Sequence, residues 1–405
     1  MRRLAVLSLH TSPLVQPGTG DSGGMNVYVR ELVSALAQAG IDCDVFTRTW
    51  SDHLPRVVPV EPGVRVVHID AGPRAEVPKE DLPGYVPEFT RGVVEHVRAS
   101  GDVDAIHANY WLSGVAGHAA KHELGLPLVS TFHTLARVKV DADVAESAER
   151  VRAEAAVIGC SDAILANCEE ESRDLQSHYD ARPERIEIVA PGVDHAFFSP
   201  GDRDGARKGI GWGSDGPMLL FVGRIQPLKG LDVAVGTLAE LDDQRAELAV
   251  VGGPSGADGP AELERVLELA NDLGVRERIR FVEPQPHHLL STWYRAADVV
   301  LVPSRSESFG LVALEAAACG RPVVAAGVGG LRTIVEDGRT GFLIDGRAPA
   351  SYASAVATLL DDPALATAMG HAGAERASRY TWSTAAARLR RLYSDLVART
   401  LVDCS

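Results

Sequence analysis

Residues Ser306–Glu315 read Ser-Glu-Ser-Phe-Gly-Leu-Val-Ala-Leu-Glu, and they follow the apolar run Asp298–Pro303. That run has the composition of a strand that is buried on both faces of a parallel sheet. The decamer opens a helical pattern that ends at Cys319-Gly320, where the glycine is a common helix cap. Glu307 is therefore expected in the loop before the helix, and Glu315 about two turns inside it. Strand, loop and helix in this order predict a doubly wound α/β fold.

The start of this predicted helix is a candidate binding site. Its first N–H groups have no partner within the helix and attract phosphate oxygens. Two carboxylates would repel a bare phosphate, but they suit a ligand that has a phosphate at one end and hydroxyl donors beside it. A nucleotide sugar has this chemistry.

Size and composition limit the other possibilities. A chain of 405 residues is long for a single core and favours two domains. The net charge of −15 argues against an extended surface for nucleic acid or anionic lipid. No apolar run is long enough to span a membrane, and Met1–His10 is interpreted as a buried strand rather than a signal peptide. We expect a cytoplasmic protein without stable membrane insertion.

The cysteine and histidine patterns predict no metal site. The chain has an odd number of widely spaced cysteines and no CxxC motif, so we expect reduced, inert thiols. The pair His287-His288 has no carboxylate or cysteine at metal-binding spacing. The cysteines are Cys43, Cys160, Cys168, Cys319 and Cys404.

Short β-branched segments alternate with amphipathic helices along the whole chain and predict two Rossmann-like parallel-sheet domains that face a cleft. We expect the first domain at 1–198, the second at 199–380, and a closing helix within 381–405. The linker region is predicted at Ser199–Asp204 and Gly211–Gly216. Strands are predicted at Leu4–Leu9, Asp42–Arg48, Val64–Ile69, Ala105–Ala108, Leu128–Phe132, Ala163–Asn167 and Ile186–Val189, then at Met218–Val222, Leu248–Val251, Ile279–Val282, Val299–Val302, Val323–Ala326 and Gly341–Ile344.

Three local patterns carry candidate chemistry. The glycine-rich loop Gln16–Asn26 precedes a helix start and would let backbone approach a ligand, although a plain surface loop is the alternative. Arg224 and Lys229 follow a strand and could neutralise a leaving diphosphate. The alternative is that both are solvated surface cations without a ligand. His133 ends an apolar strand and could contact a sugar, or be structural.

A further set of residues is dispersed, and nothing in their spacing joins them. Each one alone could equally be a surface or packing residue. The set is His10, Lys79, Tyr110, Thr134 and Arg150.

Taken together, the motifs resemble the retaining GT-B glycosyltransferases of the family-4 type. The specific elements are Gly23-Gly24, Gly223-Arg224 with Lys229, and Glu307 with Glu315, and the resemblance spans Leu4 to about Leu396. It implies a hexosyltransferase with an N-terminal acceptor-binding domain, a C-terminal nucleotide-sugar-binding domain and a C-terminal helix that returns to the first domain. It implies no required cofactor.

Several segments are more specifically similar to an actinobacterial branch of this family. Members of the branch move N-acetylglucosamine from UDP-N-acetylglucosamine to 1D-myo-inositol 3-phosphate in the first step of mycothiol biosynthesis. The resemblance to this branch rests on the segments Ser8–Pro13, Gly24–Tyr28, Ala71–Pro73 with Lys79-Glu80, Tyr110–Gly114 and His133–Ala136. The chain departs from the pattern at Asn109, where a histidine is usual, and in the segment Val138–Glu149, which is shorter than usual.

The resemblance also implies residue roles. The acceptor would contact His10, Asp21, Ser22, Gly23, Gly24, Met25 and Asn26, and its phosphate would lie on Lys79, Tyr110, Thr134 and Arg150. The donor would contact Gln16, Pro17, Gly24, Arg224, Lys229, Gln285, Glu307 and Glu315. Catalysis is assigned to His133, Arg224, Lys229 and Glu307. A backbone cation site is placed at Tyr294, Arg295 and Ala297, where Mg²⁺ could bind without a catalytic role.

Two alternatives stay open at this point. A family-4 transferase with another acceptor, such as phosphatidylinositol, would need a basic membrane-docking face, for which Arg388, Arg390 and Arg391 are the hint. A non-catalytic nucleotide-sugar-binding protein would keep the fold and lose the chemistry. The expected partners are the two substrates, and a homodimer is compatible with the sequence.

Overall fold

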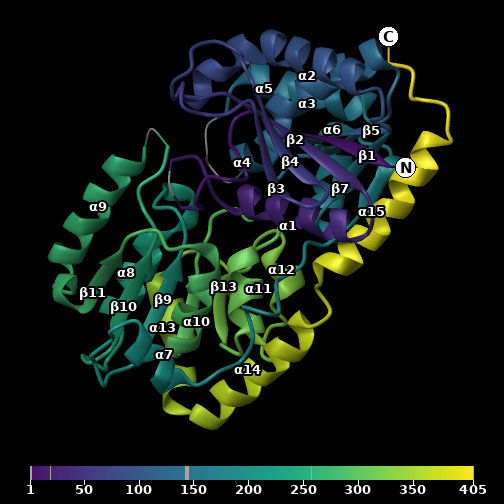
Figure 1. Ribbon diagram of the computed structural model, residues 1–405. Helices are drawn as coiled ribbons and strands as arrows, with labels where there is room; N and C mark the ends of the chain where they lie inside the picture. Colours follow the sequence, from purple (N-terminus) through teal and green to yellow (C-terminus); the bar gives the residue numbers. More distant parts are fainter. Residues whose placement is uncertain (1, 19, 142–145, 257, 405) are drawn as a thin grey trace. The chain divides into compact units, whose positions relative to one another are not determined.

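The computed structural model describes residues 2–18, 20–141, 146–256 and 258–404, which form two compact units (Figure 1). The first unit comprises Met1–Val15, Met25–Gly192 and Trp382–Ser405, and the second comprises Gln16–Gly24 and Val193–Thr381. The units therefore divide after Gly192, whereas the sequence pattern predicts a boundary after residue 198. Thr19 of the glycine-rich loop and residues 142–145 of the shortened segment lie outside the described residues.

The first unit has an eight-stranded sheet in which neighbouring strands are parallel except at one edge. The strand order is β3 (Val57–Glu61), β4 (Val64–Ile69), β2 (Asp42–Arg48), β1 (Arg3–Leu7), β5 (Ala105–Asn109), β6 (Leu128–Thr131), β7 (Ala163–Ala166), β8 (Ile186–Ile188). The edge strand β3, which runs antiparallel to β4, is absent from the sequence prediction. It contains Pro59, a residue that sheets tolerate mainly at edges, and none of its residues is fully buried.

Alternate residues of each central strand face opposite helical layers. In β1, Leu4 and Val6 pack against one layer, and Ala5 and Leu7 pack against the other. The first layer consists of α1 (Gly24–Gln38) and α15 (Trp382–Val397), and the second of α2 (Val86–Ser100) and α3 (Tyr110–Leu124), as Figure 1 shows. The unit also contains η1 (Lys79–Tyr85), α4 (Ala136–Asp141), α5 (Ala148–Cys160), α6 (Glu169–Tyr179) and η2 (Pro183–Arg185).

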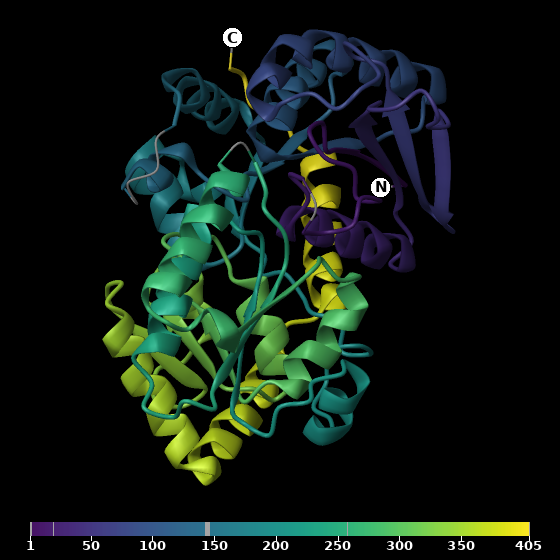
Figure 2. The same cartoon turned by 90° about the vertical axis from the view of Figure 1, so that its left-hand side faces the viewer.

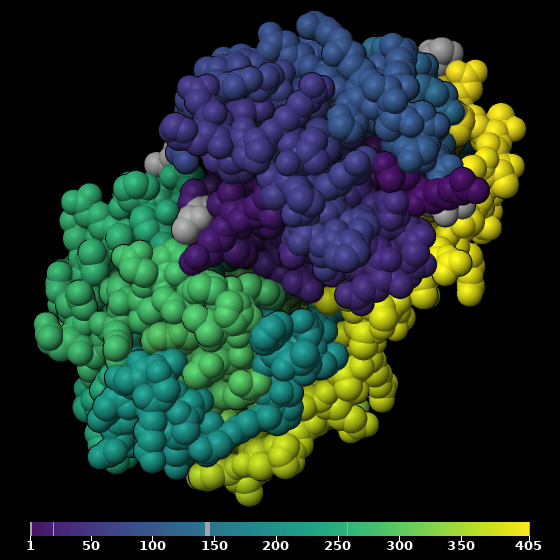
Figure 3. All heavy atoms as spheres, viewed as in Figure 1, coloured from purple at the N-terminus to yellow at the C-terminus, as the bar shows by residue number. Residues whose placement is uncertain are grey.

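The C-terminal helix α15 belongs to the first unit. Its residues Leu389 and Tyr393 are fully buried, and the Tyr393 hydroxyl is 2.8 Å from Nδ1 of His107 on β5. On its outer side Arg388 donates to the carbonyl of Ile188 and Arg390 to that of Ala39. In the space-filling view of Figure 3 this helix, in yellow, is exposed along one side.

The second unit has a six-stranded parallel sheet with helices on both faces. The strand order is β11 (Ile279–Val282), β10 (Glu247–Val251), β9 (Met218–Val222), β12 (Val299–Val302), β13 (Val323–Ala326), β14 (Gly341–Ile344). The α-helices are α7 (Arg203–Gly209), α8 (Leu231–Ala239), α9 (Gly259–Asp272), α10 (Leu290–Ala296), α11 (Leu311–Ala318), α12 (Leu331–Ile334), α13 (Pro349–Asp361) and α14 (Pro363–Ala377). The 3-10 helices are η3 (Pro227–Lys229), η4 (Arg276–Arg278) and η5 (His287–Leu289). Helix α7 occupies part of the predicted linker.

Each sheet has one position where the strand order reverses. In the first unit it lies between β1 and β5, and in the second between β9 and β12. Ligands of open α/β sheets bind beyond the carboxyl ends of the strands at such reversals. His10 and Tyr110 follow β1 and β5, while Arg224 and Glu307 follow β9 and β12. The topology therefore places candidate site residues of both units where ligands are expected.

The cysteines correct one prediction. Cys160 and Cys404, which are 244 residues apart, form a disulfide within the first unit, whereas the sequence predicts that all five thiols are reduced. The pairing has no local sequence signal, because it joins the end of α5 to the C-terminal tail. Cys43, Cys168 and Cys319 are buried and take no part in this disulfide. None of the helices formed by the described residues has the length and apolarity needed to span a bilayer.

Candidate functional site

In the second unit, the loops after β9 and β12 bring a lysine and a glutamate together. Lys229 on η3 donates from Nζ to Oε2 of Glu307 over 2.6 Å. The carbonyl of Glu307 accepts from the N–H of Gly330 at 2.9 Å, which fixes the backbone of this loop. Both side chains keep some exposure, 25% for Lys229 and 18% for Glu307. An anion and a hydroxyl donor can therefore reach the two charges.

Arg224 lies against the glycine-rich loop. Its Nη1 is 3.4 Å from both the carbonyl of Asp21 and the hydroxyl of Ser255. A Cβ added to Gly23 would lie 3.0 Å from Nε of Arg224, so glycine is what allows this approach. Ser255 also donates to the carbonyl of Gly20. Ser255 has no sequence signal of its own, because it follows Pro254 in a run that lacks a nucleotide-binding pattern.

The first residues of the same glycine-rich loop contact the loop that follows β11. Nε2 of Gln16 donates to the carbonyl of Pro284 at 2.7 Å, and a Cβ on Gly18 would lie 3.1 Å from Cβ of Pro284. Gln285, the next residue, turns its side chain toward the carbonyl of Glu283 at 2.8 Å. The predicted donor residues Gln16, Pro17 and Gln285 are thus neighbours in the second unit.

Glu315 is more enclosed than the sequence suggests. Helix α11 begins at Leu311, so Glu315 lies about one turn inside it rather than two. Its Oε1 is 2.7 Å from Nε2 of His287, and its Oε2 accepts from the hydroxyl of Tyr294 at 2.8 Å. His287 therefore has a carboxylate partner in space, although the two residues are 28 positions apart in the sequence. Burial, with the Glu315 carboxylate adding to it, raises the pKa of Tyr294 well above its usual range.

The predicted backbone cation site lies at the end of α10. The N–H of Ala297 donates to the carbonyl of Tyr294 at 3.2 Å, and the guanidinium of Arg295 donates to the carbonyl of Ser199 at 2.8 Å. The Tyr294 carbonyl is thus already engaged within the helix end. Cation binding there stays a prediction.

In the first unit, the dispersed residues converge on Tyr110. Nζ of Lys79 lies 4.5 Å from the ring centroid of Tyr110, and Cζ of Arg150 lies 5.0 Å from it. The ring of His10 packs against it with centroids 4.6 Å apart. Nη2 of Arg150 donates to the carbonyl and hydroxyl of Thr134, at 3.0 and 2.9 Å. Five residues that no spacing connects therefore form one cluster.

Tyr110 is held in an unusual conformation at the centre of this cluster. It is the first residue of α3, directly after β5, and its φ is +73°. Non-glycine residues rarely adopt positive φ, and such strain is concentrated at functional positions. The geometry turns the chain from strand to helix while the ring lies 4.5 and 5.0 Å from two cationic groups.

The charges of the cluster are unequally compensated. Arg150 is buried and forms ion pairs with Glu154 and Glu146, each at 2.8 Å. Glu146 also contacts Lys139. Lys79, in contrast, forms no ion pair with any residue that the structure describes. Lys79 thus supplies an uncompensated positive charge, which suits an anionic ligand.

His133 lies behind this cluster at the end of β6. Its Nε2 is 2.9 Å from Oδ1 of Asn109, and its ring packs edge-on against Tyr28. Burial lowers the pKa of His133 to about 3, with a smaller contribution from the nearby His107. The imidazole is therefore neutral near pH 7 and is suited to hydrogen bonding rather than to carrying charge. Like Tyr110, His133 has positive φ, +62°.

The remaining predicted acceptor residues belong to the two ends of the glycine-rich loop. Asn26, on α1, donates from Nδ2 to the hydroxyl of Thr11 and the carbonyl of Ser12, at 2.7 and 2.6 Å. Its amide therefore braces the segment that follows β1. Met25 packs at the edge of the first unit's core, whereas Asp21–Gly24 group with the second unit. The carbonyl of Ser22 accepts from the N–H of Gly18 at 2.9 Å.

Comparisons with known proteins identify the family to which the chain belongs. Residues 22–197 match the family model described as Glycosyltransferase Family 4, and residues 202–376 match the model of glycosyl transferases group 1. The chain is 49% identical over 405 residues to D-inositol 3-phosphate glycosyltransferase 2 of Catenulispora acidiphila, with 97% of this chain and 95% of the relative covered. It is 48% identical to the D-inositol 3-phosphate glycosyltransferase of Kribbella flavida, with coverage of 95% and 94%.

Solved structures share the fold. A sucrose-phosphate synthase from Thermosynechococcus elongatus superposes with a TM-score of 0.92 at 32% identity, covering 98% of this chain and 100% of that chain. An Anabaena protein that was crystallised with UDP and glucose has a TM-score of 0.79 at 20% identity, with the same coverage. The latter likeness supports the two-domain α/β architecture alone.

Proposed function

The chain belongs to group 1 of the glycosyl transferases and is a hexosyltransferase of the GT-B fold, and we propose that it glycosylates an inositol phosphate. In full, the proposed reaction moves N-acetylglucosamine from UDP-N-acetylglucosamine to 1D-myo-inositol 3-phosphate with retention of configuration. The names of the curated relatives support the acceptor. The identity of the donor sugar nucleotide and the retention of configuration are implied by the resemblance of the sequence motifs to those of the family-4 transferases.

The cluster around Tyr110 is the observation that carries the acceptor assignment. Lys79, which has no carboxylate partner among the described residues, and the guanidinium of Arg150 both lie against the Tyr110 ring, and Arg150 donates to the hydroxyl of Thr134. Together they offer charge and hydrogen bonds to a phosphate monoester. His10 lies on the same ring and could contact a cyclitol hydroxyl.

The donor assignment is supported by the second unit. Arg224 and Lys229 can neutralise the diphosphate, and the start of α11 adds N–H donors. Glu307 can accept hydrogen bonds from sugar hydroxyls. Glu315 would bind the ribose through lone pairs that its contacts to His287 and Tyr294 leave available.

The proposed mechanism is attack from the face of the leaving group. Both donor-side carboxylates are engaged, Glu307 by Lys229 and Glu315 by His287 and Tyr294, so neither is arranged as the nucleophile of a double displacement. An inositol hydroxyl would attack the anomeric carbon as the bond to the diphosphate breaks. A phosphate oxygen of the departing UDP would take the hydroxyl proton. Arg224 and Lys229 would stabilise the charge that develops on this oxygen, and neutral His133 would contact the sugar.

The alternative acceptor in a membrane has less support. The basic residues Arg388 and Arg390 on α15 donate to backbone carbonyls of the same unit rather than forming a free lipid-binding face. A non-catalytic binding protein would have little use for the uncompensated Lys79 beside Thr134 and Arg150. We therefore favour the soluble phosphorylated cyclitol.

A matrix of donors and acceptors tests the proposal. UDP-N-acetylglucosamine, UDP-glucose and GDP-mannose would each be supplied with inositol 3-phosphate, inositol 1-phosphate, free inositol or vesicles that contain phosphatidylinositol. We expect the highest kcat/KM for UDP-N-acetylglucosamine with inositol 3-phosphate, and an α-linked product by NMR. Faster turnover with the vesicles, or with free inositol, would overturn the acceptor assignment, and an inverted product would overturn the mechanism.

A further inference from the structure

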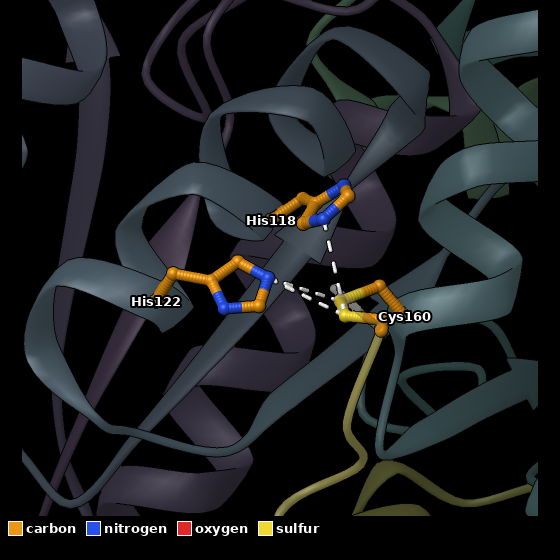
Figure 4. Close-up of side chains that lie close together, drawn as sticks. His118, His122 and Cys160 are labelled. Carbon is orange, nitrogen blue, oxygen red and sulfur yellow. Dashed lines mark hydrogen bonds between the residues drawn. A yellow bond between two sulfur atoms is a disulfide. The ribbon is translucent and has the colours of Figure 1, made fainter.

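Four metal-ligating side chains converge in the first unit, away from the residues assigned to substrates. His118 and His122 come from α3, Cys160 is the last residue of α5, and Cys404 lies in the tail after α15. One donor atom from each lies within 4.8 Å of all the others. Figure 4 shows both imidazole rings directed at the sulfur atoms. Among the described residues this is the one group of three or more histidine, cysteine or carboxylate ligands so arranged.

The local structure explains why the four meet. His118 and His122 are one helical turn apart, so they share a face of α3. Helices α3 and α5 approach closely, since a Cβ on Gly114 would lie 2.9 Å from Cγ1 of Val157. The two imidazole centroids are 5.2 Å apart. This close contact of the two helices carries Cys160, at the end of α5, to the face of α3 that bears the histidines.

A buried ion pair brings the tail to the same place. Lys121 contacts Asp162 at 2.9 Å, and both side chains are almost fully buried. Oδ1 of Asp162 accepts from the N–H of Val402 at 2.7 Å, two residues before Cys404. Nζ of Lys121 also donates to the carbonyl of Cys160 at 2.8 Å. Figures 1 and 2 both show the yellow tail reaching the blue helices of this unit.

The two donor distances from His122 match those of a tetrahedral metal site, and the distance from His118 to Cys404 is slightly longer. Zinc bonds of about 2.3 Å to sulfur and about 2.0 Å to nitrogen place neighbouring tetrahedral donors about 3.3 to 3.8 Å apart. Nε2 of His122 lies 3.3 Å from Sγ of Cys404 and 3.5 Å from Sγ of Cys160. Nε2 of His118 lies 4.0 Å from Sγ of Cys404. A disulfide alone would not need two imidazoles facing its sulfurs.

We propose that, when Cys160 and Cys404 are reduced, these two thiolates and the imidazoles of His118 and His122 bind one Zn²⁺ ion. The disulfide would first take two electrons and two protons from a thiol reductant, which is itself oxidised to a disulfide. Zn²⁺ would then displace the two thiol protons, and the sulfurs would separate to the spacing of tetrahedral ligands. The C-terminal tail would be fastened to α3 and α5 in both states, by a covalent bond when oxidised and by the metal when reduced.

Cobalt substitution tests this site in the full-length protein. The chain would be reduced, freed of metal with a chelator, and titrated anaerobically with Co²⁺ and then with Zn²⁺. We expect the intense visible bands of tetrahedral Co²⁺ and a sulfur-to-cobalt charge-transfer band, both lost when Zn²⁺ displaces the cobalt. Native mass spectrometry should then show about one Zn²⁺ per chain. The oxidised protein should give no cobalt spectrum before reduction.

Matched variants decide whether these four residues are the ligands. Cys404→Ser and His122→Gln should abolish the tetrahedral spectrum, and Cys404 lies in the tail, where its replacement leaves both cores intact. Cys168→Ala and His371→Gln, which change a buried cysteine and an exposed histidine outside the cluster, should leave the spectrum unchanged. A reduced chain that gives no tetrahedral spectrum, or a spectrum that survives Cys404→Ser, would overturn the proposal. So would a disulfide that withstands reduction of the folded protein, as judged by a thiol count.

Discussion

The ammonium of Lys229 donates to the carboxylate of Glu307 over 2.6 Å, although 78 residues separate them in the chain. The two residues meet because their loops leave the ends of β9 and β12, the adjacent strands at which the order of the second sheet reverses. Both side chains of the pair keep some exposure, so each charge can exchange its partner for a ligand group. A nucleotide sugar would supply both, phosphate oxygens for Lys229 and hydroxyls for Glu307.

Replacing Glu307 tests this exchange. We expect Glu307→Gln to lower kcat by about 100-fold or more, because hydrogen bonds that strengthen in the transition state are worth this much. Lys229→Met should have a similar effect, and the double variant should lose less than the product of the two. The measurement is steady-state UDP release, with urea denaturation to check the fold. Glu336→Gln, which alters an exposed ion pair with Arg339, is the control. Unchanged turnover in Glu307→Gln would remove this residue from the mechanism.

The acceptor cluster makes a separate prediction. Lys79→Ala should raise the acceptor KM by about 10-fold or more, because a hydrogen bond to a charged group is lost. Slow hydrolysis of the donor by water should persist, since the donor contacts are in the second unit. Initial rates with each substrate varied in turn separate the two effects. Lys208→Ala, an exposed lysine on α7, should change neither. A change confined to donor affinity would contradict the assignment of Lys79.

Much of the fold is predictable from the sequence because its strands are buried and parallel. Runs such as Met218–Val222 and Val299–Val302 are continuously apolar, and their predicted bounds agree with β9 and β12. The antiparallel edge strand β3 escapes prediction, because its side chains are only partly buried and Pro59 interrupts its pattern. The donor motifs are recognisable for a related reason. Each lies within one loop, directly after a strand that can be identified.

The acceptor cluster cannot be derived from spacing. Tyr110 follows β5, Thr134 follows β6, and Arg150 lies on α5, so only the order of the strands in space brings them together. The partners of Glu315 are hidden for the same reason, because His287 is 28 residues away on a different element. Long-range pairs such as these depend on how the sheet is wound, which local periodicity does not report.

Replacing the buried Glu154 should weaken both the stability of the chain and the acceptor site. It is fully buried and accepts from Nε of Arg150 at 2.8 Å, from the N–H of Ala136 at 2.9 Å and from the hydroxyl of Tyr179. Breaking a buried ion pair on one side typically costs about 3–5 kcal/mol. We therefore expect Glu154→Gln to lower the free energy of unfolding by about this amount and to raise the acceptor KM. Urea denaturation and initial rates measure the two effects.

A control for this prediction lies on the same helix. Glu149, in the first turn of α5, is exposed, and Glu149→Gln should change stability by less than about 0.5 kcal/mol. Equal stability of the two variants would contradict the view that Arg150 depends on Glu154 for its charge balance.

The pH dependence of stability should contain a contribution from Glu171 on α6. Its carboxylate is buried and accepts from the N–H of Asn167 at 2.7 Å, and burial raises its pKa from 4.5 to about 7. The folded chain therefore holds this proton where the unfolded chain has released it. Stability from this group is fully present below pH 4.5 and is lost as the pH rises toward 7, by an amount on the order of 3 kcal/mol.

The Glu171→Gln variant isolates this contribution. Glutamine keeps an acceptor for the N–H of Asn167 and cannot ionise, so the free energy of unfolding of the variant should fall less steeply, or rise more steeply, between pH 5 and 7 than that of the wild type. Urea titrations at half-unit pH intervals measure the difference in slope. Glu169→Gln, an exposed change on the same helix, should retain the wild-type slope. Parallel profiles for wild type and Glu171→Gln would show that the Glu171 carboxylate titrates alike in the folded and unfolded chains.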